Sequence, residues 1–439
     1  MKFKTIFIFF SLINLNFLYS SDIIIPADTI VDYYDNNHLR YEDFVYKENI
    51  KTILIYRDGW ELSYPIIKLN SNDKIKLSFD DLDNDVKNYT YTLIHCDADW
   101  HPSNIMPSDF IDGFAENQIT DYKYSFNTFV KYVHYNLLIP NENIKPKISG
   151  NYILKVYENY DQENLVLTAR FCVEDGSISI NAQIKQSTLI DFRKTHQEID
   201  FSLINNSKSI ADPYNDIKIV ISQNNRKDNE IKGLKPLFVK DNELVYDYDF
   251  DNAFSGGSEF RHIDLKSMRF MSDKIKNIEY TAPYYNVELF TDEQKPFKVY
   301  YFDNDINGKY LVKVQEGNDS EIESDYVYVY FTLPYEAPIV DGNIYVLGEL
   351  SEWNFSSNNR MIYNFNKKCY QLKMLLKQGY YNYEYVILKD GNKIADSSTI
   401  EGNHYETEND YLIYVYYKDI QSRYEKLAGV KIINSLTNK

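Results

Sequence analysis

The side chains with the clearest chemical potential are His95, Cys96, Asp97 and His101, which lie together in one short segment. A thiolate nucleophile or a zinc ion would use residues of these types. A nucleophilic thiol needs a base within hydrogen-bond reach, but successive residues of a β-strand point to opposite faces, so His95 and Cys96 would diverge. Zinc would need further His or Cys ligands at matched spacing, which the sequence lacks. The segment therefore predicts neither a nucleophilic cysteine nor a zinc site.

Two acidic runs have the composition of calcium loops. Residues 80–85 (DDLDND) alternate carboxylates, and residues 303–308 (DNDING) match the first half of a helix-loop-helix calcium loop. The twelfth position of such a loop should be a bidentate Glu, and here it is Val314. Strand-like segments on both sides favour a hairpin turn through Asn307-Gly308 instead. Calcium binding at residues 80–85 stays open, because crowded carboxylates either bind cations or remain solvated on a loop.

Other catalytic motifs are absent from the sequence. It contains no G-x-S-x-G, no H-E-x-x-H and no phosphate-binding glycine loop, since Gly256-Gly257 is not followed by Lys-Ser/Thr. Paired carboxylates for glycoside hydrolysis are a three-dimensional arrangement that a sequence does not test. We therefore expect no catalytic residue and no cofactor, and we assign no residue to a metal site.

A loop rich in large apolar side chains is the remaining candidate for function. The residues that we assign to a partner interface are Trp100, His101, Ile105, Met106, Phe110 and Phe114. Trp, Met and Phe are enriched at the cores of protein interfaces, where they often supply most of the binding energy. The same side chains could instead fold back as a small local core beneath the loop, and the sequence leaves both interpretations open.

The N-terminus has the pattern of an export signal. Two lysines precede an apolar run, and the small residues Ser20 and Ser21 follow it, which predicts a cleaved signal peptide at 1–21 and an N-terminal extension at 22–42. The apolar run is shorter than the roughly 20 residues that a spanning helix needs, which disfavours a retained membrane anchor. We expect an exported protein.

The net charge excludes some classes of partner, and the cysteines bear on whether the chain contains a disulfide. A net charge of −18 argues against nucleic-acid binding and against an anionic membrane surface. No later stretch is apolar enough for membrane insertion. A disulfide between Cys96 and Cys172 would suit an oxidising compartment, although two buried, reduced cysteines are the favoured interpretation.

The chain is organised as short strands. It contains 42 Tyr and 25 Phe, and runs such as 151–157 and 325–331 alternate apolar and polar residues, as half-buried strands do. Helical periodicity is scarce: residues 261–269 are a candidate short helix or turn, and residues 421–435 are a candidate C-terminal helix. The prediction is an all-β protein.

The length of 439 residues predicts three domains. We expect three consecutive β-sandwich, immunoglobulin-like domains at 43–175, 176–335 and 336–430. Pro334 and Pro338 are a plausible hinge before the last of them.

The expected third domain has a pattern of its own. Residues 343–354 (NIYVLGELSEWN) and 379–386 (GYYNYEYV) resemble early-set immunoglobulin-like domains, a group that includes glycogen-binding modules. The resemblance implies an early-set sandwich for 336–430. It also suggests Trp353 as a glycan-type position, although this side chain could simply pack the turn against the sandwich, and a fold alone does not carry a function.

A broader resemblance covers nearly the whole mature chain, in order. Beyond residues 78–128, it includes 59–65 (GWELSYP), 150–157 (GNYILKVY), 195–201 (THQEIDF), 234–239 (LKPLFV), 256–261 (GGSEFR) and 377–383 (KQGYYNY). These segments resemble the plug proteins of the type IX secretion system of Bacteroidota.

The resemblance implies a non-enzymatic subunit. It would bind the periplasmic mouth of the giant outer-membrane β-barrel translocon, at the inner face of the outer membrane, and seal it while no substrate is engaged. On this basis Trp100→Ala combined with Phe110→Ala is predicted to leave the protein folded and to weaken barrel association. The alternative is a periplasmic or surface glycan-binding protein. It predicts at least two exposed aromatic side chains in a row on one face of 343–417.

Overall fold

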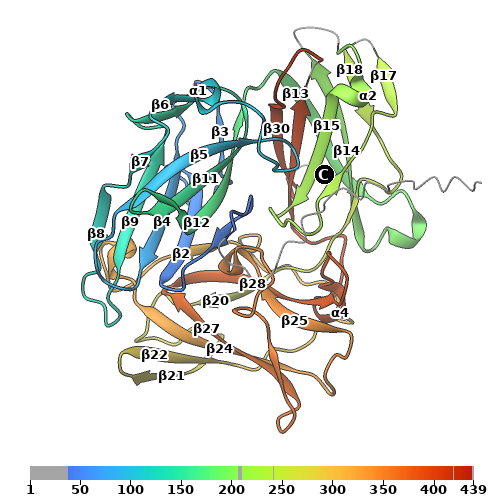
Figure 1. The fold of residues 1–439 in the computed structure, drawn as a ribbon. Helices are drawn as coiled ribbons and strands as arrows, with labels where there is room; N and C mark the ends of the chain where they lie inside the picture. The colour runs from blue at the N-terminus through green and yellow to red at the C-terminus, as the bar shows by residue number, and fades with distance from the viewer. Residues whose placement is uncertain (1–37, 206–209, 241, 419, 438–439) are drawn as a thin grey trace, which may run out of the picture. The chain divides into compact units, whose positions relative to one another are not determined.

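The computed structural model describes residues 38–205, 210–240, 242–418 and 420–437. In this part of the chain the strands dominate, and each α-helix is a single turn (Figure 1). The prediction of an all-β protein built from sandwiches is confirmed. The predicted signal peptide and most of the extension lie outside the described residues. No described helix has the length and apolarity needed to cross a membrane.

The first sandwich packs a six-stranded sheet against a four-stranded one. In spatial order the first sheet contains β1 (Phe44–Val45), β12 (Asp161–Glu174), β11 (Gly150–Glu158), β5 (Tyr89–Cys96) and β7 (Asn117–Gln118), with β3 (Ile66–Lys68) beside β12. The second contains β2 (Ile50–Arg57), β4 (Ile75–Asp81), β9 (Val133–Ile139) and β8 (Asp121–Tyr124). Helix α1 (Pro107–Phe110) and the pair β6 (Ile111–Gly113) and β10 (Ile144–Pro146) complete it.

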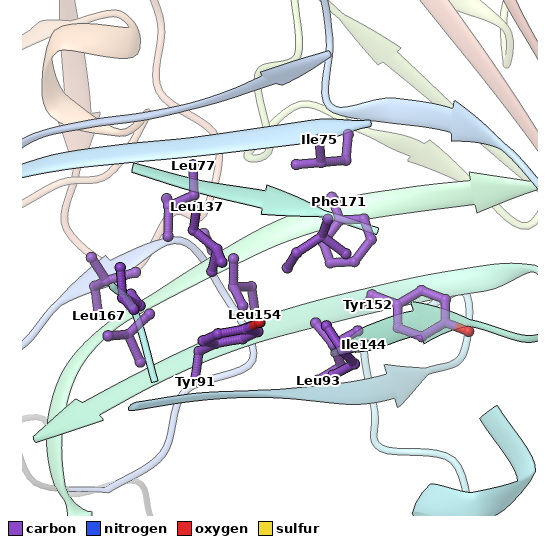
Figure 2. Close-up of a cluster of buried hydrophobic side chains, with 14 of the residues drawn as sticks. Ile75, Leu77, Tyr91, Leu93, Leu137, Ile144, Tyr152, Leu154, Leu167 and Phe171 are labelled. Carbon is purple, nitrogen blue, oxygen red and sulfur yellow. The ribbon is translucent and has the colours of Figure 1, made fainter. Parts of the chain in front are cut away.

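The core of this sandwich follows from the period-two pattern of its strands. Alternate residues point to one face, so each sheet presents a row of apolar side chains to the other. Figure 2 shows Leu77 and Leu137 from one sheet beside Leu154 and Leu167 from the other, all within one buried cluster.

The second sandwich is assembled from two distant parts of the chain. Its first sheet contains β13 (Ile178–Gln186), β14 (His196–Asn205), β18 (Glu243–Tyr246) and β17 (Phe238–Lys240), with β19 (Ala253–Ser255) beside β14. The second contains β16 (Ile231–Lys232), β15 (Ile217–Gln223), β29 (Asp410–Tyr417) and β30 (Lys426–Asn434). The short helices η1 (Ile190–Phe192) and α2 (Pro213–Asp216) lie in its connections.

The third sandwich lies in sequence between these two parts. Its first sheet contains β20 (Arg261–Asp264), β28 (Gly379–Lys389) and β23 (Tyr310–Val312), with β25 (Gly342–Leu347) beside β28. The second contains β21 (Ile275–Thr281), β22 (Tyr284–Leu289), β24 (Tyr326–Pro334), β27 (Cys369–Lys377) and β26 (Ile362–Asn364). Its short helices are α3 (Ser320–Glu323), η2 (Glu349–Ser351) and α4 (Ser398–Glu401).

Strand pairing therefore groups the chain differently from the boundary expected at 335/336. The C-terminal strand β29 pairs with β15 along its length, and the buried cluster of the second sandwich joins residues such as Ile219 and Ile413. Strands that precede the expected hinge, such as β20 and β24, belong to the third sandwich. The expected boundary followed sequence order, whereas β15 takes its partner from the end of the chain.

Candidate interaction surface

Trp100 lies at the junction of the first and second sandwiches. Its side chain is only 9% exposed, and it packs in a cluster with Cys172 of the first sandwich and Tyr414 of the second. The guanidinium of Arg170 stands over the indole ring, 4.3 Å from its centroid. Trp100 therefore fills an internal junction.

Phe110 and Ile105 also turn inward. Phe110, on α1, is 5% exposed, and its ring lies 5.9 Å from that of His95 and 6.2 Å from that of Tyr152. Ile105 is half-buried against the same core. These two side chains anchor the loop to the first sandwich.

The other three assigned residues face solvent. Met106 is 72% exposed, Phe114 is 70% exposed, and His101 is exposed as well. The structure thus divides the six residues into three that hold the loop and three that a partner could touch. Their role in a partner interface stays a prediction.

His95 and Cys96 are buried structural residues. His95 Nδ1 lies 2.8 Å from Ser103 Oγ and Nε2 lies 3.2 Å from the Ser149 carbonyl oxygen. Burial lowers the pKa of His95 to about 4 and raises the pKa of the Cys96 thiol to about 12, so both are neutral near pH 7. Cys96, Cys172 and Cys369 are free and buried.

Ligand atoms of Asp97, Asp99 and His101 lie within 4.8 Å of one another at the start of the loop. Asp97 Oδ1 accepts the backbone N–H groups of Asp99 and His101, each at 2.9 Å. The cluster is thereby explained as an aspartate-capped turn.

The acidic run at 80–85 begins inside the protein. Asp80 Oδ2 lies 2.6 Å from the Lys377 ammonium and accepts a hydrogen bond from the Tyr326 hydroxyl at 2.7 Å, and its Oδ1 lies 2.7 Å from His134 Nδ1. Burial opposes ionisation of Asp80, but Lys377 and His134 outweigh it and hold the pKa of this carboxyl below its usual value. Asp81 is likewise paired, 3.1 Å from the ammonium of Lys87. These carboxylates have protein partners, and Asp80 joins the first sandwich to the third.

The second acidic run forms a tight turn. Asn307 and Gly308 have positive φ angles of 53° and 77°, and Asp305 Oδ1 accepts the Asn307 N–H at 2.8 Å. Trp353 packs directly on this turn, because a Cβ at Gly308 would lie 2.4 Å from the indole ring.

Trp353 is therefore a packing residue in this structure. It is 6% exposed, and its ring stands edge-on to Phe260 at 6.1 Å. Residues 343–417 are all described, and Phe365 is their one exposed Phe, Tyr or Trp side chain. The pair of exposed aromatics that the glycan-binding alternative predicts is not present.

Buried polar contacts join the sandwiches at each junction. Besides Asp80–Lys377, Arg226 of the second sandwich lies 3.1 Å from Glu384 of the third. The Tyr64 hydroxyl of the first sandwich donates to Asp410 of the second at 2.8 Å. A cavity of about 70 Å³ lies where all three meet, lined in part by Trp100, Tyr414, Lys309, Glu349 and Glu352.

The carboxyls at this cavity should make stability depend on pH. Burial raises the pKa of Glu349 from its ordinary value of 4.5 to about 7. The Tyr310 N–H and Lys309 act in the opposite direction and lower it. The folded state therefore binds this proton more tightly than the unfolded state. The resulting stabilisation is complete below pH 4.5 and is lost as the pH rises through about 7.

Glu349→Gln should remove this pH dependence, because an amide side chain does not titrate. Its amide oxygen can still accept the Tyr310 N–H, so the hydrogen bond is kept. At pH 8 we expect the variant to exceed wild type in free energy of unfolding by about 2–3 kcal/mol, with little difference at pH 4.5. Urea unfolding at both pH values measures this, with the exposed Glu336→Gln as control. Equal pH profiles for wild type and Glu349→Gln would contradict the expectation.

An exposed group of aromatic side chains lies beyond the assigned loop and was missed from the sequence. We call it the aromatic edge surface, and it consists of Tyr122, Tyr124, Phe126, Phe129 and Tyr280, which are 42–59% exposed. Phe129 of the first sandwich contacts Tyr280 of the third, with ring centroids 4.8 Å apart. The signal was present as aromatic residues at positions 122, 124 and 126, a period of two.

Comparisons with known proteins agree with the sequence resemblance. The family model described as the type 9 secretion system plug protein 1st domain matches residues 50–175, which correspond to the first sandwich. The crystal structure of a hypothetical protein from Parabacteroides merdae is 35% identical, with a TM-score of 0.88, and the match covers 90% of this chain and 100% of that one. None of the curated proteins matches the chain. These similarities support a role related to type IX secretion in the cell envelope. The chain belongs to the type IX secretion system plug protein family.

Proposed function

We propose that this protein is a non-enzymatic plug that binds the periplasmic mouth of the outer-membrane β-barrel of the type IX translocon. It seals the barrel while no substrate is engaged. It reaches the periplasm through its N-terminal signal peptide and lies against the inner face of the outer membrane. It uses no cofactor.

The observation that carries this proposal is the match of residues 50–175 to the first domain of the plug family. The buried contacts between sandwiches support it, because a seal must keep its form against an open pore. Asp80 and Lys377 are each no more than 1% exposed, and a buried ion pair between two sandwiches resists their separation, since parting them would leave each charge without its partner.

The exposed apolar side chains support a protein partner. Met106, Phe114 and the aromatic edge surface present Met, Phe and Tyr, which are enriched at interface cores. The net charge of −18 disfavours direct attachment to anionic lipid headgroups. A protein partner at the membrane fits both properties.

An affinity pull-down tests the proposal. The tagged mature protein is incubated with detergent-solubilised outer membranes of its own organism, and we expect it to recover a very large β-barrel protein. A strain that lacks the protein should also admit a small hydrophilic dye across its outer membrane, and the reintroduced gene should restore the barrier. An eluate without the barrel, together with retention of the protein on an α-glucan column, would replace the plug with the glycan-binding alternative.

A further inference from the structure

Strand β8 is the unprotected edge of a sheet in the first sandwich. It is the last strand in the order β2-β4-β9-β8, and it pairs with β9 on one side only. All four of its residues are exposed. An edge strand presents unpaired backbone groups, and these can pair with a strand from another chain.

The hydrogen-bond pattern identifies which backbone groups are open. The Ser125 N–H donates to the Tyr132 carbonyl oxygen at 2.9 Å, one step beyond the pair Tyr124–Val133. Hydrogen-bonded pairs alternate along an antiparallel ladder, so the backbone N–H and C=O groups of the odd-numbered residues of β8 point toward β9. The N–H and C=O groups of Tyr122 and Tyr124 therefore point away from it.

Phe126, the next even-numbered residue, shows that the backbone at this edge can form a hydrogen bond with another segment. The Phe126 N–H donates at 2.9 Å to the carbonyl oxygen of Ile322, on α3 of the third sandwich. A neighbour from the third sandwich thus pairs with the edge at Phe126, and the described residues place no strand beside Tyr122 and Tyr124.

The side chains of the open positions extend the core of the sandwich. Tyr122 and Tyr124 share one face of β8, and the Tyr122 ring lies 5.9 Å from that of the buried Tyr135. Lys123 points to the opposite face, where its ammonium lies 3.2 Å from Asp319. A strand laid along β8 would bury alternate side chains on the two tyrosine rings.

We propose that β8 is a docking edge that accepts an extended segment of the translocon barrel as a fifth strand of this sheet. The segment pairs its backbone with Tyr122 and Tyr124 and places apolar residues at every second position, against the aromatic edge surface. The strands of a closed barrel have no free edge, so the segment belongs to a part of the barrel protein outside the ring of strands, on its periplasmic side. The inference rests on the proposed function, because it names the surface through which the plug meets its barrel.

Proline at position 124 separates backbone pairing from side-chain contact. Tyr124→Pro removes an N–H that points to the open edge and leaves the β9 ladder intact, whereas Tyr124→Ala removes the same ring and keeps the N–H. We expect Tyr124→Pro to weaken barrel binding by about tenfold or more relative to Tyr124→Ala, with both variants folded by circular dichroism. If Tyr124→Pro unfolds, Tyr122→Pro and Tyr122→Ala provide the same comparison at the other open position.

The pull-down with wild-type protein separates this inference from the proposed function. If wild type recovers no barrel, the proposed function fails. If wild type recovers the barrel and the proline and alanine variants bind equally well, the plug function stands and the docking edge is overturned. A wild-type dimer by light scattering that becomes monomeric in Tyr124→Pro would also overturn it, because the occupant would then be a second copy of this chain.

Discussion

Replacing Lys377 with methionine should lower the free energy of unfolding by about 3–5 kcal/mol, because it leaves a buried carboxylate without its cation. The Lys377 ammonium lies 2.6 Å from both Asp80 Oδ2 and the Glu321 carbonyl oxygen, and it stands over the Tyr132 ring. Methionine retains most of the volume and none of the charge. Urea unfolding followed by tyrosine and tryptophan fluorescence measures the loss.

Two further variants control this experiment. Lys373→Met lies on the same strand, β27, at an exposed position, and we expect it to change stability by less than about 1 kcal/mol. The double variant Asp80→Asn with Lys377→Met should recover part of the loss, because the unpaired charge is gone. A double variant less stable than Lys377→Met alone would show that the unpaired Asp80 carboxylate is not the source of the loss.

The second large effect is expected at Trp100. Trp100→Ala should lower the free energy of unfolding by about 3–5 kcal/mol, because it opens a cavity between the first and second sandwiches and removes the ring under Arg170. Phe110→Ala should act in the same direction through the core of the first sandwich. The burial of both side chains reverses the sequence-based expectation that the double variant stays folded.

Phe114→Ala is the matched control, since it removes an aromatic ring of the same loop that is 70% exposed. We expect it to change stability by less than about 0.5 kcal/mol. Thermal unfolding of the three single variants makes the comparison. Similar melting temperatures for Trp100→Ala and Phe114→Ala would contradict the packing role of Trp100.

The sequence predicted the fold class because strand formation leaves a local trace. Alternating segments such as 151–157 and 325–331 lie in strands β11 and β24. The turn through Asn307-Gly308 was also readable, because residues of these types tolerate the positive φ angles found there. Each of these features depends on neighbouring residues alone.

Elements that depend on distant partners in the chain could not be predicted from the sequence. Residues 421–435 were expected to include a short helix, yet β30 forms there because it pairs with β29. Residues 261–269 were expected to form a short helix or turn, and residues 261–264 instead form β20, which pairs with β28. In both cases tertiary pairing overrides a weak local preference.

The same limit applies to the candidate site. Asp80 and Lys377 are separated by 297 positions, so the sequence showed an acidic run where the structure shows a buried ion pair. Residue types could not separate the side chains of the loop that pack inward, such as Trp100, from those that face outward, such as Phe114. That distinction requires knowing what lies beneath the loop.

The split second sandwich sets an order of events during folding. A chain that emerges N-terminus first presents β15 long before β29 and β30, with the whole third sandwich between them. Until β29 arrives, β15 keeps an open edge, and unpaired strand edges are sites of aggregation. A chain that emerges N-terminus first therefore needs protection until its last strand arrives. Loss of residues 410–439, such as by a late stop codon, would remove β29 and β30 from the second sandwich, and with them Tyr411, Ile413 and Val415 from its core, while the inserted third sandwich keeps all its strands.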